Sequence, residues 1–162
     1  MYNRLSNKNG FSLVELVLVL TIIGILVAVA IPRFIDVRDK AEHASVDTMV
    51  SSLESALAIH SARKFVNQQR PSVHNPFEDL TNKPRNYNGV FDPINSQNTP
   101  PGTWSFRSER NWVVYNPQLP IRGGWENNGT RYIIFQVEVV IENLDTVGMN
   151  LTTTSLYRYQ WN

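Results

Sequence analysis

A continuous run of uncharged residues near the N-terminus constrains this chain more than any other feature. Residues 16–32 contain no ionisable side chain, and the apolar stretch as a whole covers 22 residues, 11–32. As an α-helix this stretch would be about 33 Å long, enough to span the hydrocarbon core of a bilayer. The sequence therefore predicts a membrane-spanning helix over residues 11–33, with Arg4 and Lys8 on its cytoplasmic side.

A single carboxylate, that of Glu15, stands near the start of this apolar stretch. A charge inside a spanning helix costs about 2.5–3.5 kcal/mol on insertion scales, so it normally has a partner. The uncharged run that follows offers none. The nearest candidate is a terminal amine at Phe11, created by a cut between Gly10 and Phe11. A signal-peptidase cut after residues 28–30 (Ala-Val-Ala) is the less favoured alternative.

The residues around this junction resemble the signature of the type IV prepilin and pseudopilin family. The shared features are a short basic leader, Gly10-Phe11 at the cut, and Glu15 at the fifth position of the mature chain. The resemblance covers about residues 8–40 and includes Gly24 and the run Ala-Ile-Pro-Arg-Phe at 30–34. Later in the chain, Pro-Gly-Thr-Trp-Ser-Phe at 101–106 is similar to a segment of mannose-sensitive-haemagglutinin-type pilins.

This resemblance implies a structural subunit of a type IV pilus that serves adhesion, motility or related surface functions. Prepilin peptidase would remove residues 1–10 and the new amine of Phe11 would be methylated. Glu15 would neutralise the amine of a neighbouring subunit, while Gly24 and Pro32 would let the helix lose helicity as subunits pack. The implied partners are identical or related pilins, the peptidase/methyltransferase, an inner-membrane assembly platform and, before assembly, the bilayer. The subunit would wait in the bacterial inner membrane, head outside the cytoplasm, and then enter an extracellular pilus.

After residue 33 the helical pattern becomes amphipathic. Apolar side chains recur at spacings of three and four, which predicts a helix over residues 34–66 with one face on a sheet. Pro32 removes a backbone donor and crowds the preceding turn, so a kink or a locally melted turn is expected there. The stripe consists of Val46, Met49, Val50, Leu53, Ala56, Leu57 and His60.

The remainder of the chain reads as a long loop followed by β-strands. Residues 67–102 contain six prolines and many amides, so they indicate either a functional surface loop or a poorly ordered insertion. Residues 103–162 show strand patterns separated by turn signals at Gly123-Gly124 and at 127–129. The strongest period of two places Ile133, Phe135, Val137, Val139 and Ile141 on one face. The predicted fold class is α+β: the long helix packed on an antiparallel sheet of about four strands, with residues 34–162 as the globular head.

Composition excludes several classes of function. The chain has 15 basic and 14 acidic residues, and loss of Arg4 and Lys8 with the leader leaves 13 and 14. This balance predicts no nucleic-acid partner. Cysteine is absent, so no disulfide or thiolate metal site can form. Many type IV pilins close a C-terminal loop with a disulfide, and this chain departs from that pattern.

Candidate chemical residues are few and scattered. His43 and His60 would lie about 25 Å apart on one helix, too far to share a metal, and His60 is expected at the edge of the apolar stripe. His74 stands apart from both in the sequence. An acidic group at 142–145 is better explained as a polar turn than as a calcium loop. We therefore expect no cofactor, no metal site, no catalytic residues and no enzymatic activity.

The aromatic residues of the strand region allow a binding surface or a sheet core. A carbohydrate-binding platform and stacking along a fibre are the functional alternatives, and core packing is favoured over both. Two other functions remain open: a pseudopilin of type II secretion, and a single-pass anchored binding module that keeps its leader. The aromatic residues are Trp104, Phe106, Trp112, Tyr115 and Trp125.

Overall fold

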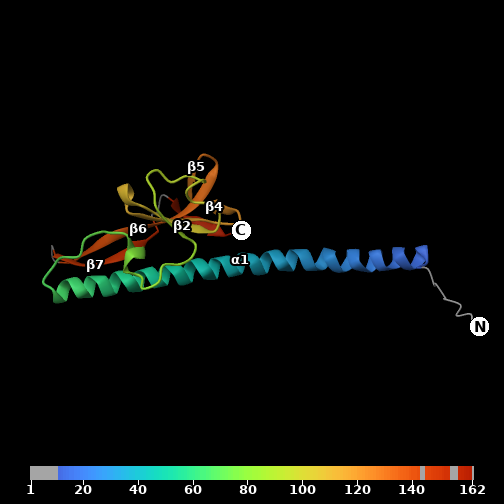
Figure 1. The fold of residues 1–162 in the computed structure, drawn as a ribbon, viewed down its shortest axis with the longest axis horizontal. Coiled ribbons are helices and arrows are strands. Elements are labelled where there is room, and N and C mark those ends of the chain that lie inside the picture. The colour runs from blue at the N-terminus through green and yellow to red at the C-terminus, as the bar shows by residue number, and fades with distance from the viewer. Residues whose placement is uncertain (1–10, 143–144, 154–156, 162) are drawn as a thin grey trace, which may run out of the picture. The chain divides into compact units, whose positions relative to one another are not determined.

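The structure is a computed structural model that describes residues 11–142, 145–153 and 157–161 (Figure 1). One long helix, α1 (Leu13–Val66), is followed by strands and two short 3-10 helices. The chain divides into two compact units, Met1–Arg38 and Asp39–Asn162, with the boundary inside α1. The predicted fold class, a long N-terminal helix with a mostly antiparallel sheet, is confirmed.

Helix α1 passes through Pro32 without a break in its helical conformation, so the locally melted turn expected there is absent. Proline removes a single intrahelical hydrogen bond, and the turns on either side keep theirs. The helix ends where Gln68 adopts a left-handed conformation with φ 56°. The amides of Gln68 and Gln69 then donate to the carbonyls of Phe65 and Lys64, which closes the last turn as a Schellman motif.

Four antiparallel strands form the centre of the sheet, as the sequence predicts. Their spatial order is β2, β3, β6 and β7, and the registers pair Trp104 with Tyr115, Val113 with Phe135 and Val139 with Met149. The strands are β2 (Thr103–Arg107), β3 (Trp112–Asn116), β6 (Thr130–Glu142) and β7 (Asp145–Thr152).

Further strands extend this centre beyond the predicted number. β1 (Tyr87–Val90) pairs in parallel with β2, and β5 (Trp125–Asn127) forms a hairpin with β6. β4 (Ile121–Gly123) and β8 (Tyr159–Trp161) make a separate two-stranded sheet. A short 3-10 helix, η2 (Ser108–Arg110), connects β2 to β3. The β5–β6 hairpin turns through Asn128 and Gly129, both with positive φ, as the Asn-Gly turn signal predicts.

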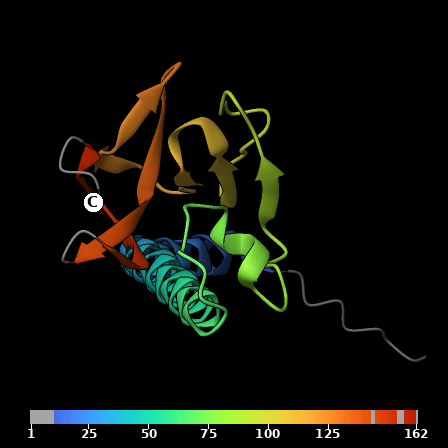
Figure 2. The ribbon, with the colours of Figure 1, turned by 90° about the vertical axis from the view of Figure 1, so that its left-hand side faces the viewer.

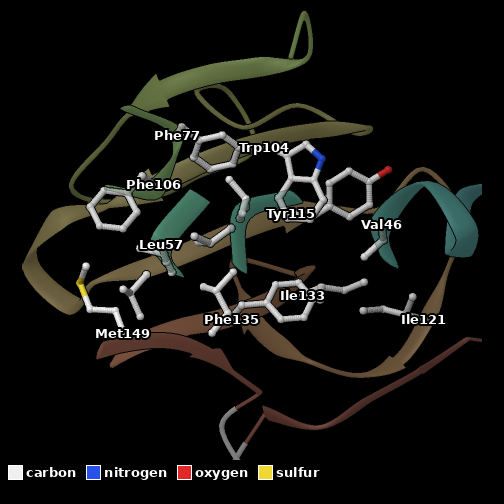
Figure 3. Close-up of a cluster of buried hydrophobic side chains, with 14 residues drawn as sticks. Val46, Leu57, Phe77, Trp104, Phe106, Tyr115, Ile121, Ile133, Phe135 and Met149 are labelled. Atoms are coloured by element: carbon white, nitrogen blue, oxygen red, sulfur yellow. The ribbon is translucent and has the colours of Figure 1, made fainter. Parts of the chain in front are cut away.

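The main core lies between the sheet and the C-terminal half of α1 (Figures 2 and 3). The predicted helical stripe is confirmed, since Val46, Leu53 and Leu57 are at most 1% exposed. Ile133, Phe135 and Val137 face these side chains from β6. Ile141 was expected on the same face but is 63% exposed, because the register shifts between Val140 and Ile141. A β-bulge of this kind moves the following side chains off the core face.

The opposite face of the sheet carries a second core. The outer part of this face is open to solvent, with Glu138 exposed. Nearer the start of β6, however, Tyr132 and Ile134 are fully buried beneath Ile94. Ile94 belongs to the proline-rich segment 67–102, which the sequence describes only as a loop.

That proline-rich segment contains defined structure. It includes the 3-10 helix η1 (Pro76–Asp79), the parallel strand β1 and three fully buried side chains, those of Phe77, Ile94 and Thr99. Asn75 caps η1 by accepting a hydrogen bond from the Phe77 amide at 3.2 Å. Isolated buried residues such as Phe77 and Ile94 do not recur at a regular spacing. The sequence therefore does not show that they are buried, and the tertiary structure does.

A carboxylate on α1 holds the loop between β3 and β4. Glu42 accepts hydrogen bonds from the Tyr115 hydroxyl at 2.8 Å and from the Gln118 and Leu119 amides at 2.6 and 3.2 Å. Burial, together with this hydrogen bond and the charge of Glu42, raises the pKa of Tyr115. Within the head, these hydrogen bonds therefore link the helix to the sheet in addition to the apolar core.

Candidate functional site

The N-terminal part of α1 presents apolar side chains in all directions. Every residue from 11 to 38 is exposed, and Leu16, Ile22 and Leu26 are 51%, 50% and 63% accessible. Helices that are apolar all round belong in a membrane or in a protein core. Among the described residues, α1 is one helix whose length and composition suit a membrane crossing. This segment therefore requires lipid or other subunits around it.

Glu15 lies in the first turn of α1, where the helix dipole favours a negative charge. Its carboxylate contacts no cation among the residues that the structure describes. Arg33, the next basic residue along α1, is about 27 Å further along the axis and cannot reach it. The acid thus sits on an apolar surface with its charge unpaired by the rest of the described helix.

Gly24 is in the middle of this exposed segment. A Cβ atom built at this position has no other atom within 4 Å, so nothing inside the described subunit requires glycine here. Glycine also weakens a helix interior by roughly 0.5–1 kcal/mol relative to alanine. Any packing reason for Gly24 must therefore come from another molecule, and Pro32 adds a second weak point eight positions later.

Two of the predicted processing positions fall at the edge of the described chain. Gly10 and the whole predicted leader, residues 1–10, lie outside the described residues. Phe11 is described, precedes the helix and is 72% exposed. The structure thus leaves the roles of Gly10, Phe11, Glu15, Gly24 and Pro32 as predictions.

The strand aromatics lie in the core, as favoured from the sequence. Trp104, Phe106, Trp112 and Tyr115 are each at most 5% exposed, so they are not available as a carbohydrate platform. The ring centroids of Trp104 and Tyr115 are 4.6 Å apart, and both residues belong to the cluster in Figure 3. Trp125 is partly buried against Trp112 in the second core. The predicted polar turn at 142–145 includes Asn143, which lies outside the described residues.

Two histidines that look unrelated in the sequence come together in the head. His60 Nδ1 is 2.7 Å from Asp79 Oδ1, and His74 Nε2 is 2.5 Å from Asp79 Oδ2. The two imidazole rings stack with centroids 4.1 Å apart. His43 lies elsewhere, 3.3 Å from Asp47. The sequence correctly separates His43 from His60 but misses the pairing with His74, because the segment after the helix returns to α1 without any repeat or spacing that signals it.

An unburied apolar helix with an acid in its first turn, continued by a helix packed on an antiparallel sheet, defines the pilin-like class of proteins. Comparison with known proteins agrees with this class. The family model for the prokaryotic N-terminal methylation motif matches residues 5–31, which include Gly10, Phe11, Glu15 and Gly24. The chain is therefore similar to type IV pilins and to type II secretion pseudopilins.

Individual relatives come from both systems. The chain is similar to the type IV narrow pilus major component PilA5 of Thermus thermophilus, with 54% identity over 50 residues, 31% of this chain and 43% of that protein. It is also similar to the type II secretion system core protein G of Klebsiella michiganensis, with 32% identity over 81 residues, 50% of this chain and 55% of that protein. Core protein G of Vibrio cholerae is 30% identical over 83 residues, 51% of this chain and 55% of that protein.

These matches cover only about half the length of each relative, or less. No solved structure matches the chain at a significant level. The similarity to the mannose-sensitive-haemagglutinin-type pilins around residues 101–106 remains a prediction.

Proposed function

We propose that this chain is a structural subunit of a type IV pilus, cut after Gly10, methylated at Phe11 and polymerised through the exposed half of α1. The observation that carries the proposal is the apolar, fully exposed helix with the carboxylate of Glu15 at its start. The methylation motif over residues 5–31 and the 54% identity to a pilus component support it.

Before assembly, the exposed helix lies in the inner membrane and the head lies outside the cytoplasm. Basic residues ahead of the helix favour this orientation. Prepilin peptidase acts on the cytoplasmic side, where it removes residues 1–10. The membrane then shields the apolar surface that the subunit itself leaves open.

During assembly, the same surface packs against identical helices in the fibre. Apolar burial from water is worth about 25 cal/mol per Å², but lipid already covers this helix, so the net gain comes mainly from close packing. Gly24 offers the smallest side chain for such an approach and has open space around it in the subunit. The repeated head-to-tail contact produces an open filament because its rotation does not close on itself.

Glu15 sets the register of the growing filament. Its carboxylate pairs with the amine of Phe11 on a neighbouring subunit, and each charge neutralises the other as both leave the interface region of the lipid. The absence of a cationic partner among the described residues of α1 supports an intermolecular partner. The assembly platform supplies this subunit to the base of the fibre.

A pseudopilin of type II secretion is the second candidate function. The specific observation in its favour is that similarity to core protein G extends over about half of this chain, compared with 31% for the pilus component. The higher identity to the pilus component, 54% compared with 32%, favours the pilus. The third alternative, an anchored binding module with an aromatic ligand surface, loses its main support because those aromatics are buried.

The decisive experiment is to shear surface material from the native cells and determine the N-terminal residue and mass of this protein in it. A methylated Phe11 in the sheared fraction supports an assembled extracellular pilin. A processed Phe11 confined to the envelope supports the pseudopilin. An intact Met1 contradicts both. Gly10→Val should block leader removal, and mature protein from this variant would place the cut elsewhere.

A further inference from the structure

The cluster formed by His60, His74 and Asp79 joins three separate parts of the head. His60 is in the last turns of α1, His74 is in the segment that follows it, and Asp79 ends the 3-10 helix η1. The three side chains are 17–25% exposed, so solvent reaches them while most of their surface is covered. One ligand atom from each lies within 4.8 Å of the other two.

The two ring nitrogens of His74 have different partners. Its Nδ1 is 3.2 Å from the carbonyl oxygen of Ser72, and its Nε2 is 2.5 Å from the Asp79 carboxylate. With the proton of the neutral ring on Nδ1, where the Ser72 carbonyl accepts it, Nε2 presents its lone pair toward the Asp79 carboxylate.

Two features of this geometry suit a bound cation. His60 Nδ1 is directed at the other oxygen of the same carboxylate, and its ring stacks 4.1 Å from that of His74. The hydrogen bond from His74 Nδ1 to the Ser72 carbonyl is the usual outer-shell arrangement that points Nε2 at a metal.

We propose that His60 Nδ1, His74 Nε2 and a carboxylate oxygen of Asp79 bind a Zn²⁺ ion. Imidazole nitrogens with one carboxylate suit zinc, whereas magnesium and calcium prefer sites built from oxygen alone. Tetrahedral zinc with bonds of 2.0–2.2 Å needs ligand atoms roughly 3.3 Å apart, so the side chains need only small rotations to enclose it. Three protein ligands leave a fourth position for water, and a hollow of about 210 Å³ adjoins His60 and Asp79.

The bound ion would connect the end of α1 to η1. Phe77 of η1 is fully buried in the main core, so the position of η1 matters for the packing of the head. Zinc would thus stabilise the segment 67–102 against the helix in a chain that contains no cysteine for a disulfide. This inference concerns the isolated subunit and does not depend on the pilus assignment.

The test uses the untagged full chain in detergent micelles, freed of metal with a chelator and titrated with ZnCl₂ in a calorimeter. We expect one equivalent of Zn²⁺ to bind and, at a free concentration 100 times Kd, a rise in Tm of roughly 8–14 °C. MgCl₂ should give neither effect. Substitution of Co²⁺ should produce the visible absorption of a tetrahedral nitrogen-oxygen site.

Variants identify the ligands. His60→Gln and His74→Gln should each weaken zinc binding by more than roughly 10-fold, the lower limit seen on loss of even an outer-shell partner. His43→Gln is the matched control, an exposed histidine on the same helix, and should bind as the wild type does. Failure of the wild-type chain to bind zinc would overturn the proposal whether or not the variants fold. Equal binding by wild type and His74→Gln would also overturn it.

Discussion

Replacement of Glu42 by alanine tests how the helix is held to the sheet. The substitution removes the common acceptor of three donors, the Tyr115 hydroxyl and the amides of Gln118 and Leu119. Residues 42 and 115 are 73 positions apart, so the contact has no local substitute in the chain. Tyr115 itself is only 5% exposed, and its hydroxyl would lose its hydrogen bond to Glu42.

The size of the effect follows from the partial burial of these bonds. A hydrogen bond to a charged group contributes about 1.5–3 kcal/mol when buried, and exposed ion pairs contribute much less. The Tyr115 and Leu119 bonds are partly buried and the Gln118 bond is exposed. We therefore expect Glu42→Ala to lower the free energy of unfolding of the head by about 2–3 kcal/mol, and Tm by roughly 6–15 °C.

Tryptophan fluorescence during thermal unfolding of the full chain in detergent measures this change. All four tryptophans belong to strands of the head, so the signal reports the head and not the apolar part of α1. A second readout is tyrosine ionisation by ultraviolet absorbance. Because the bond to Glu42 and its charge help to raise the pKa of Tyr115, the variant should ionise at lower pH than the wild type.

The matched control is Glu54→Ala, an exposed acid on the same helix. It should change the free energy of unfolding by no more than about 0.5 kcal/mol, as is usual for surface substitutions. The reasoning is refuted if Glu42→Ala and Glu54→Ala unfold at the same temperature. A Tyr115→Phe and Glu42→Ala double-mutant cycle separates the hydroxyl bond from the two amide bonds.

Three further predictions concern assembly and pH. Glu15→Ala should fold and insert normally but yield few fibres in a shear assay, and a normal yield would remove the charge-pairing role. Gly24→Ala should be accepted by the subunit and strengthen its helix by roughly 0.5–1 kcal/mol in circular dichroism, since a Cβ meets no atom within 4 Å. If this variant is stable but yields fewer fibres, Gly24 is needed for packing in the fibre. If the variant subunit is less stable than the wild type, the expectation that position 24 has room for a methyl group is wrong. The free energy of unfolding of the head should fall as the pH rises above about 10, because tyrosines with raised pKa resist ionisation only in the folded state. Unfolding temperatures that rose with pH above about 10 would contradict this prediction. Burial is the largest cause of the raised pKa of these tyrosines, which are Tyr87, Tyr115, Tyr132 and Tyr159.

The strands predicted from alternation were correct where the pattern is strong and local. β2 and β3 carry four of the five aromatic residues named from the sequence, and the Asn128-Gly129 turn joins β5 to β6. The prediction for Ile141 was wrong because a bulge near the end of β6 shifts the register.

The sequence by itself determined the long helix, its exposed apolar half, the position of Glu15 and the amphipathic stripe that packs on the sheet. These features follow from periodicity and from the absence of charge, both of which act over neighbouring residues. Only the tertiary structure showed that residues 67–102 cover the sheet, that Glu42 holds the β3–β4 loop, and that His60 and His74 meet at Asp79. Each of these contacts joins residues far apart in the chain through single side chains. A single side chain has no periodic pattern in the sequence, so its partner is known only from the folded structure.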